Sequence, residues 1–356
     1  MKQLLGFSLC FLLTITLMGQ NNSCRTLLKV VKQGDHAKVA QLSKKTNPNC
    51  SYRGDGEPRS PLGAAARAGD LKMGKLLIEN GAKVAYKGSG DASALMLAVQ
   101  GENLDFVKLV LKEGADVNRK VRGDGTALLM AARTGNEAIL SYLIEQGADV
   151  NGTVQGDGSP LIAAVKKQHL GATKILIENG AKPDLFVPGD ESPLYAAVKS
   201  GNITLLKLLL ESDKIDVNEE IPGDGTLLII ASKSGDMELV EILLEAGANP
   251  EKGVKGDGNP LIQAAKHGHL ELAKRLVKAG AQIDTHVIGD ETPLIKASES
   301  GHLDLVKYLV GEGADVNKSV RDGWTMRSEV RSPLLMARRA GHQDVVDYLI
   351  SKGATK

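Results

Sequence analysis

Histidine, cysteine and paired carboxylates most often carry catalysis or bind metal ions, and this sequence arranges none of them into a site. Of its seven histidines, only His267 and His269 come close to liganding spacing. No cysteine or carboxylate pair beside them completes a zinc site. The sequence also lacks a nucleophile elbow, a phosphate-binding loop and an H-E-x-x-H motif. We therefore predict no catalytic residue, no metal ion and no cofactor, and a protein that is not an enzyme.

A column of aspartates recurs within Gly-Asp-Gly or Gly-Asp-Glu triplets. Its members are Asp55, Asp124, Asp157, Asp190, Asp224, Asp257 and Asp290, and Asp91 fits the same column. All but Asp55 precede a serine, threonine or asparagine by two residues, where the carboxylate can turn back onto backbone N–H groups. Units about 10 Å apart would hold these carboxylates too far apart to share a calcium ion. We expect them to stabilise turns.

A column of mostly basic residues is the main candidate for recognition. It lies five residues after each recurring leucine of the chain and comprises Arg67, Gln100, Arg133, Lys166, Lys199, Lys233, Lys266, Glu299 and Arg339. If stacked, these side chains would form a basic stripe able to attract an acidic strip of protein or an anionic polymer. The alternative is that each cation acts on its own helix, because a cation in the last turn stabilises a helix by about 0.3–1 kcal/mol. The sequence leaves both interpretations open.

These columns arise because the chain repeats itself. Leucines recur every 33 residues, with one step of 34, at Leu62, Leu95, Leu128, Leu161, Leu194, Leu228, Leu261 and Leu294, and Leu27 and Leu334 extend the series to ten. A serine, threonine or asparagine two residues earlier can cap a helix, and proline often follows it at the first helical position. A glycine ends this short helix, and a second helix with one apolar face follows, as over 237–245. Glycine-rich turns join the units.

The repeated unit resembles the ankyrin repeat. Ser159-Pro160-Leu161-Ile162-Ala163-Ala164 and Thr292-Pro293-Leu294-Ile295-Lys296-Ala297 are similar to its T-P-L-H-x-A signature, and Gly147-Ala148-Asp149-Val150-Asn151 to its usual ending. The resemblance implies an all-α solenoid of about ten helix-turn-helix units with β-hairpin fingers. One departure is consistent, because Met96, Leu129, Ile162, Tyr195, Ile229, Ile262, Ile295 and Leu335 replace the family's histidine. The hydrogen bond of that histidine must be absent.

The repeats are expected to fill residues 26–356. We place the units near 26–55, 56–90, 91–123, 124–156, 157–189, 190–223, 224–256, 257–289, 290–322 and 323–356. Contacts between adjacent units should supply their stability, and the first and last units are polar enough to act as caps. Residues 212–215 add one residue to the pattern, so we expect a local bend there.

The resemblance also implies a protein partner that lies along the concave side of the array, against finger tips and first-helix ends. The candidate partner-binding residues are Arg67, Arg133, Lys166, Lys199, Lys233, Lys266 and Arg339 on the helices, and Arg122, Gln155 and Lys255 on the fingers. Trp324, the only tryptophan, is a further candidate on the long last finger, or else it folds back over the final unit. We expect a monomer, and no motif points to a specific nucleic acid.

Residues 1–19 have the pattern of a secretory signal peptide, with Lys2, an apolar stretch over 4–18 and the small residue Gly19. The apolar stretch is short for a membrane span, so we expect no insertion after cleavage. Residues 20–25 then form an N-terminal segment. Without Lys2 the chain has 43 basic and 43 acidic residues, so net charge names no partner. We predict a secreted or periplasmic protein, with a lipoprotein acylated at Cys24 as the alternative.

Loss of the leader removes Cys10 and leaves Cys24 and Cys50, an even pair in an oxidising compartment. A disulfide between them would close a loop of about 27 residues and contribute about 3 kcal/mol. The alternative is two unrelated small residues. Together these features predict a non-catalytic binding scaffold that acts outside the cytoplasm, with an electrostatic binder of an anionic polymer or host molecule as the alternative.

Overall fold

The computed structural model describes residues 22–52, 60–85, 93–121, 123–187, 191–212, 215–287, 291–321 and 330–355. Several predicted features lie outside these ranges, namely the leader, the finger-tip residue Arg122, Trp324, part of the irregular segment 212–215, and Asp55, Asp91, Asp190 and Asp290. The chain divides into two compact units, Met1–Pro193 and Leu194–Lys356. Each unit is described by itself.

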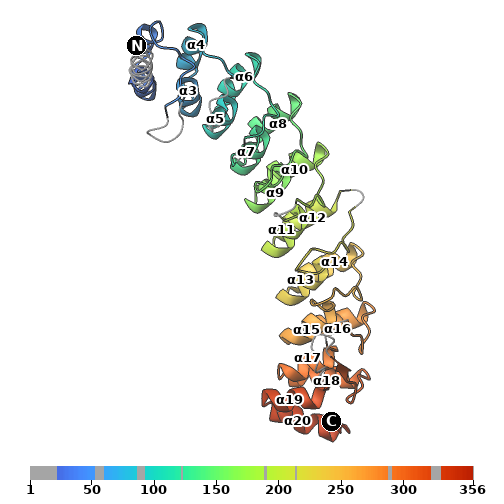
Figure 1. Cartoon of the computed structure of the whole chain (residues 1–356). Coiled ribbons are helices and arrows are strands. Elements are labelled where there is room, and N and C mark those ends of the chain that lie inside the picture. The colour runs from blue at the N-terminus through green and yellow to red at the C-terminus, as the bar shows by residue number, and fades with distance from the viewer. Residues whose placement is uncertain are drawn as a thin grey trace, which may run out of the picture. The chain divides into compact units, whose positions relative to one another are not determined.

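The first unit is a stack of helical hairpins. The pairs are the helical residues 22–32 with α2 (His36–Leu42), α3 (Pro61–Ala68) with α4 (Leu71–Glu79), α5 (Ala94–Gln100) with α6 (Leu104–Lys112), α7 (Ala127–Thr134) with α8 (Glu137–Glu145), and α9 (Pro160–Lys166) with α10 (Leu170–Glu178). The first helices α3, α5, α7 and α9 pack side by side in one row, and the second helices α4, α6, α8 and α10 form another row (Figure 1).

The second unit repeats this arrangement. Its pairs are α11 (Pro193–Ser200) with α12 (Ile203–Leu210), α13 (Leu227–Ser234) with α14 (Met237–Glu245), α15 (Pro260–His267) with α16 (Leu270–Lys278), α17 (Pro293–Glu299) with α18 (Leu303–Gly311), and α19 (Pro333–Ala340) with α20 (Gln343–Ser351). The strands β1 (Val320–Arg321) and β2 (Val330–Arg331) pair antiparallel, with Val320 opposite Arg331. Helical hairpins with short β fingers are thus the architecture that the repeats predict.

Local sequence explains where the first helices begin and end. The Ser159 hydroxyl accepts a hydrogen bond from the Ile162 N–H at 3.2 Å, and Pro160 then occupies the first helical position. Gly135 and Gly268 end α7 and α15 with φ of 76°, a left-handed conformation that favours glycine. Because the same cap and stop recur, each repeat consists of a short helix that is followed at once by a second helix.

The core lies between the two rows of helices and between neighbouring repeats. The recurring leucines are buried, as Leu128 and Leu261 show with at most 1% exposure. The aliphatic residues that replace the family's histidine are also buried, except the half-buried Leu335, and Ile162 and Ile262 lie beneath the glycines that close the preceding fingers. Apolar packing therefore takes the place of the missing hydrogen bond, and each helical hairpin depends on its neighbours to cover its apolar faces.

Polar side chains add hydrogen bonds between repeats. Asn118 Nδ2 donates to the Gly147 carbonyl at 2.9 Å, while its side-chain oxygen accepts from the Asp149 N–H at 2.8 Å. The same pair of bonds recurs at Asn49, Asn151, Asn218 and Asn317. Because a carbonyl can only accept, His169 Nε2 carries the proton in its 3.2 Å contact with the Arg133 carbonyl. These bonds fix one repeat against the next.

The N-terminal repeat is closed by a covalent bond. Cys24 and Cys50 form a disulfide with their Cα atoms 5.8 Å apart, which confirms the predicted bridge. Cys24 is buried at 2% exposure. The bond ties the helical residues 22–32 to the turn after α2. Separately, no helix in the described ranges is long and apolar enough to cross a membrane.

Candidate partner-binding surface

The basic column lies on the first helices. Arg67, Arg133 and Lys166 are in the last turns of α3, α7 and α9 in the first unit, and Lys199, Lys233, Lys266 and Arg339 are in the last turns of α11, α13, α15 and α19 in the second. The position therefore suits the interaction of a cation with the carbonyl end of a helix. Lys166, Lys199, Lys266 and Arg339 are exposed, whereas Arg67, Arg133 and Lys233 are partly buried.

The fingers present their tips beside this column. Val154 and Gly158 exchange backbone hydrogen bonds of 3.1 and 3.0 Å, and so close a turn over Gln155, Gly156 and Asp157. The same bridge joins Val121 to Gly125, Ile221 to Gly225 and Val254 to Gly258. The residue after the first bridging position is exposed in Gln155, Pro222 and Lys255. The turn is thus fixed by its backbone, while its tip side chain faces solvent.

The finger carboxylates contact the preceding repeat. Arg133 Nη2 lies 3.4 Å from Asp157 Oδ1, and Lys233 Nζ lies 3.0 Å from Asp257 Oδ1. The two aspartate side chains are only 12% and 18% exposed. The expectation that the aspartates turn back onto backbone N–H groups is wrong for these residues, because each reaches a cation of the basic column instead. These two bonds join the fingers of Asp157 and Asp257 to the repeats before them.

Variants of this contact occur where the residue types change. Lys166 Nζ lies 3.4 Å from Glu191 Oε2, and the Tyr195 hydroxyl donates to Asp224 Oδ2 at 2.7 Å. Burial, followed by the hydrogen bond to Asp224, raises the pKa of the Tyr195 hydroxyl. Sequence reasoning found both columns but not their pairing. The signal that could have indicated this pairing is the recurring separation of 24 or 25 residues between the cation and the carboxylate.

The pairing changes the electrostatics of this surface. Arg133, Lys166 and Lys233 each have a carboxylate within 3.4 Å. The charge of each is therefore largely offset when viewed from a distance. Three of the seven predicted basic residues of the helices are thus paired with carboxylates, Arg133 and Lys166 in the first compact unit and Lys233 in the second, so the column is not an uninterrupted row of unpaired positive charge.

The two histidines with liganding spacing serve the repeat instead. The rings of His267 and His269 stack with their centroids 6.0 Å apart. His267 Nδ1 contacts the Gln263 carbonyl at 2.9 Å, and His269 Nε2 contacts the Lys233 carbonyl at 3.3 Å. Each ring thus uses one nitrogen to contact a backbone carbonyl.

A buried ion cluster was missed by the sequence analysis. Glu291, only 3% exposed, pairs with Lys296 Nζ at 2.6 Å and with Arg331 Nη1 from β2. Burial acts to raise the pKa of Glu291, but the two cations outweigh it and hold that pKa below its usual value. Burial likewise acts to lower the pKa of Lys296, and Glu291 outweighs it, so that pKa is raised. The cluster joins neighbouring repeats in the second unit.

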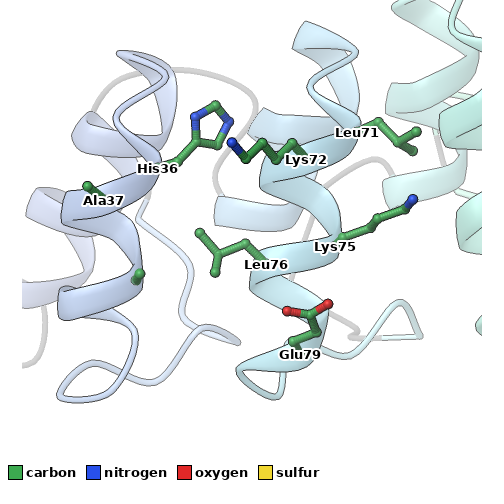
Figure 2. A pocket seen from close by; sticks show the side chains of 8 residues that line it. His36, Ala37, Leu71, Lys72, Lys75, Leu76 and Glu79 are labelled. Carbon is green, nitrogen blue, oxygen red and sulfur yellow. The ribbon is translucent and has the colours of Figure 1, made fainter.

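A groove of about 780 Å³ lies between α2 and α4 (Figure 2). Leu76 and Lys72 point toward α2 across it, and Ala37 and Ala40 line the opposite side. His36 Nε2 is held 2.9 Å from Asp70 Oδ2. The groove is formed by second helices, away from the first-helix ends.

Stacked helical hairpins joined by glycine-closed fingers define a class of repeat proteins built as solenoids. The chain belongs to the ankyrin-repeat family, because the model for ankyrin repeats (3 copies) matches residues 27–121, 120–187, 184–253, 227–320 and 261–356. This membership confirms the predicted solenoid. Ankyrin repeats generally mediate protein–protein binding, and the fold is typically a non-catalytic scaffold.

Solved structures agree with this assignment. The chain is similar to the crystal structure of the human ASB11 ankyrin repeat domain, with 28% sequence identity and a TM-score of 0.51. The match covers 64% of this chain and 98% of that one. A search of curated proteins finds no match.

Proposed function

We propose that this chain is a non-catalytic scaffold that binds a protein partner outside the cytoplasm, in the periplasm or on the exterior of a bacterium. The observation that carries the proposal is the surface made by first-helix ends and finger tips. There the exposed tip residue varies between Gln155, Pro222 and Lys255, while the turn beneath it is constant. A fixed frame with variable tips suits the recognition of a folded or extended protein.

The ion pairs support this role by holding the fingers before a partner arrives. Lys233 and Asp257 join a first helix to the next finger at 3.0 Å. Ordering a loop on binding costs free energy, so a finger already fixed to its neighbour binds with a smaller penalty. The pairing also weighs against the alternative of a polymer bound to the basic column, because a polyanion would compete with carboxylates already in place.

Two observations support action outside the cytoplasm. Residues 1–19 have the sequence pattern predicted for a secretory leader, and the structure joins Cys24 to Cys50, a bond typical of oxidising compartments. The bonded sulfur of Cys24 is also the atom that a lipoprotein anchor would require. We therefore favour a released protein over an acylated one.

The test is capture of a partner by the exported native protein, with chemical crosslinking and identification by mass spectrometry. The triple variant Lys166→Glu, Lys199→Glu, Lys233→Glu changes the first-helix ends and should lose the captured protein. The matched control Lys174→Glu, Lys207→Glu, Lys274→Glu makes the same charge change on the second helices α10, α12 and α16 and should retain it.

Circular dichroism must show the same helix content in all three proteins. Capture that survives in the first variant, or that fails equally in both, would contradict the proposed surface. A captured species that is an anionic polymer, with affinity that falls steeply as salt rises, would support the alternative.

A further inference from the structure

The N-terminal repeat carries a strong excess of positive charge. Residues 22–52 contain six basic residues and one acidic residue, Asp35, so this segment carries +5 while the whole chain carries +1. The basic residues are Arg25, Lys29, Lys32, Lys38, Lys44 and Lys45, and all six are exposed. We call this set the basic cap.

The register of the repeats places the basic cap at the open end of the stack. Leu27 occupies the column of Leu62, so Lys29 corresponds to Ala64, which is 4% exposed in the next repeat. On the second helix, Lys38 corresponds to the fully buried Met73, since each is the residue whose N–H binds the capping aspartate. Lysines thus stand where the next repeat buries apolar side chains against its predecessor.

Three of the cations form one helical face. Arg25, Lys29 and Lys32 are spaced i, i+4, i+7 on the helical residues 22–32, whose other face buries Leu27 and Leu28. The disulfide from Cys24 to Cys50 fixes this helix. The charges are therefore presented by a rigid surface rather than by a loose tail.

Solubility alone does not require one sign of charge. The last repeat also ends a stack, and the exposed polar residues of its helix α20 include Gln343, Asp344 and Asp347 beside the cations Arg338 and Arg339 of α19. A terminal repeat needs a polar outer face, which mixed charges provide. Six cations against one acid therefore call for a second explanation.

We infer that the basic cap binds an anionic membrane surface through lipid headgroup phosphates, without insertion. Protein interfaces depend on apolar or aromatic anchors. In the described residues the exposed large hydrophobic side chains are Leu170, Phe186, Met237, Val330 and Ile350, and none lies in the cap. Clustered lysine and arginine suffice for acidic lipids, because each contributes electrostatic attraction near the bilayer.

Position along the chain supports a lipid partner over a soluble one. The cap begins within a few residues of the apolar stretch 4–18, so this end of the array emerges at the bilayer during export. This point rests on the proposed action outside the cytoplasm. The vesicle experiment below does not depend on partner capture, so failure of either proposal is recognised separately.

The experiment uses the exported, disulfide-bonded protein and sedimentation with vesicles. Vesicles with about 30% phosphatidylglycerol in phosphatidylcholine should bind it at about 0.05 M salt, and pure phosphatidylcholine should not. Arg25→Gln, Lys29→Gln, Lys32→Gln should weaken binding on the order of 100-fold, since each cation contributes roughly fivefold. The control Lys112→Gln, Lys182→Gln, Lys278→Gln removes equal charge elsewhere and should change binding less than about twofold.

Circular dichroism and retention of the disulfide show that the variants are folded. Absence of vesicle binding by the unaltered protein, equal binding to neutral lipid, or an equal loss in the control would each overturn the inference. Binding of poly-L-glutamate with vesicles left unbound would also overturn it and would assign the cap to an acidic protein.

Discussion

At the scale of single residues, charged side chains join one repeat to the next. Glu291 pairs with Lys296 and Arg331 in a largely buried cluster. The pKa of Glu291 is lowered although burial opposes this, and that of Lys296 is raised although burial opposes that too. Each group is thus held in its charged form, so the cluster stabilises the folded state over a defined range of pH.

We predict that Glu291→Gln lowers the free energy of unfolding by about 3 kcal/mol at pH 7, because Lys296 loses its buried partner. A carboxyl with a lowered folded pKa stabilises above its unfolded pKa of about 4.3 and loses this effect as pH falls through the folded value. The difference between variant and parent should therefore shrink below about pH 4 in urea unfolding. On the alkaline side, Lys296 keeps its contribution below about pH 10.4 and loses it as pH rises through its raised pKa.

Glu299→Gln is the matched control. Glu299 also pairs with Lys296, at 3.3 Å, but its side chain is 37% exposed. A solvated pair of this kind contributes less than about 1 kcal/mol. Equal losses in the two variants, or a Glu291→Gln loss independent of pH, would contradict the role given to burial.

At the scale of elements, the finger is a turn set by two glycines and a buried aliphatic side chain. Gly256 and Gly258 have φ of 87° and 67°. A Cβ at Gly258 would lie 2.9 Å from Ile262 Cγ2, whereas a Cβ at Gly256 would have no atom within 4 Å. The second glycine therefore serves both backbone conformation and close packing over the following helix.

Substitution of each of these two glycines distinguishes the cost of backbone strain from the cost of lost packing within one finger. Gly256→Ala should lower the free energy of unfolding by about 1 kcal/mol through the left-handed backbone alone. Gly258→Ala should lower it by about 1 kcal/mol more, because Ile262 must shift to admit the new methyl group. Chemical unfolding of the two variants and the parent measures both terms. Equal losses of stability in the two variants would mean that Ile262 shifts without an energetic cost, and that its contact with Gly258 does not restrict the residue at position 258.

The sequence predicts helices better than it predicts contacts between repeats. Helix starts such as Ser159-Pro160 and stops such as Gly135 are local signals, and the structure bears them out. The ion pair of Arg133 with Asp157 is not local, because the two residues belong to different repeats and meet only when the repeats stack. Local turn chemistry favoured a backbone partner for Asp157, and stacking offered it a nearby cation instead.

At the scale of the molecule, each compact unit is stabilised by contacts between neighbouring repeats, and the terminal repeats differ in how they end a stack. The N-terminal repeat has a disulfide and a basic outer face, whereas the last repeat ends in mixed polar residues of α20. In a linear array, a change at one end weakens the terminal repeat first. The disulfide therefore controls the stability of the basic cap more than that of distant repeats.

We predict that reduction of Cys24–Cys50 destabilises the N-terminal repeat by about 3 kcal/mol, because the open chain gains conformational freedom. Hydrogen exchange followed by mass spectrometry should show faster exchange over residues 22–52, with α13 to α20 unchanged. The variant Cys24→Ser, Cys50→Ser should behave like the reduced protein and should not respond to reductant. Chain produced without residues 1–19 in a reducing cytosol should carry two alkylatable thiols and the same fast exchange, because the bond forms only under oxidising conditions. Uniformly faster exchange across both units would show instead that the bond stabilises the array as a whole.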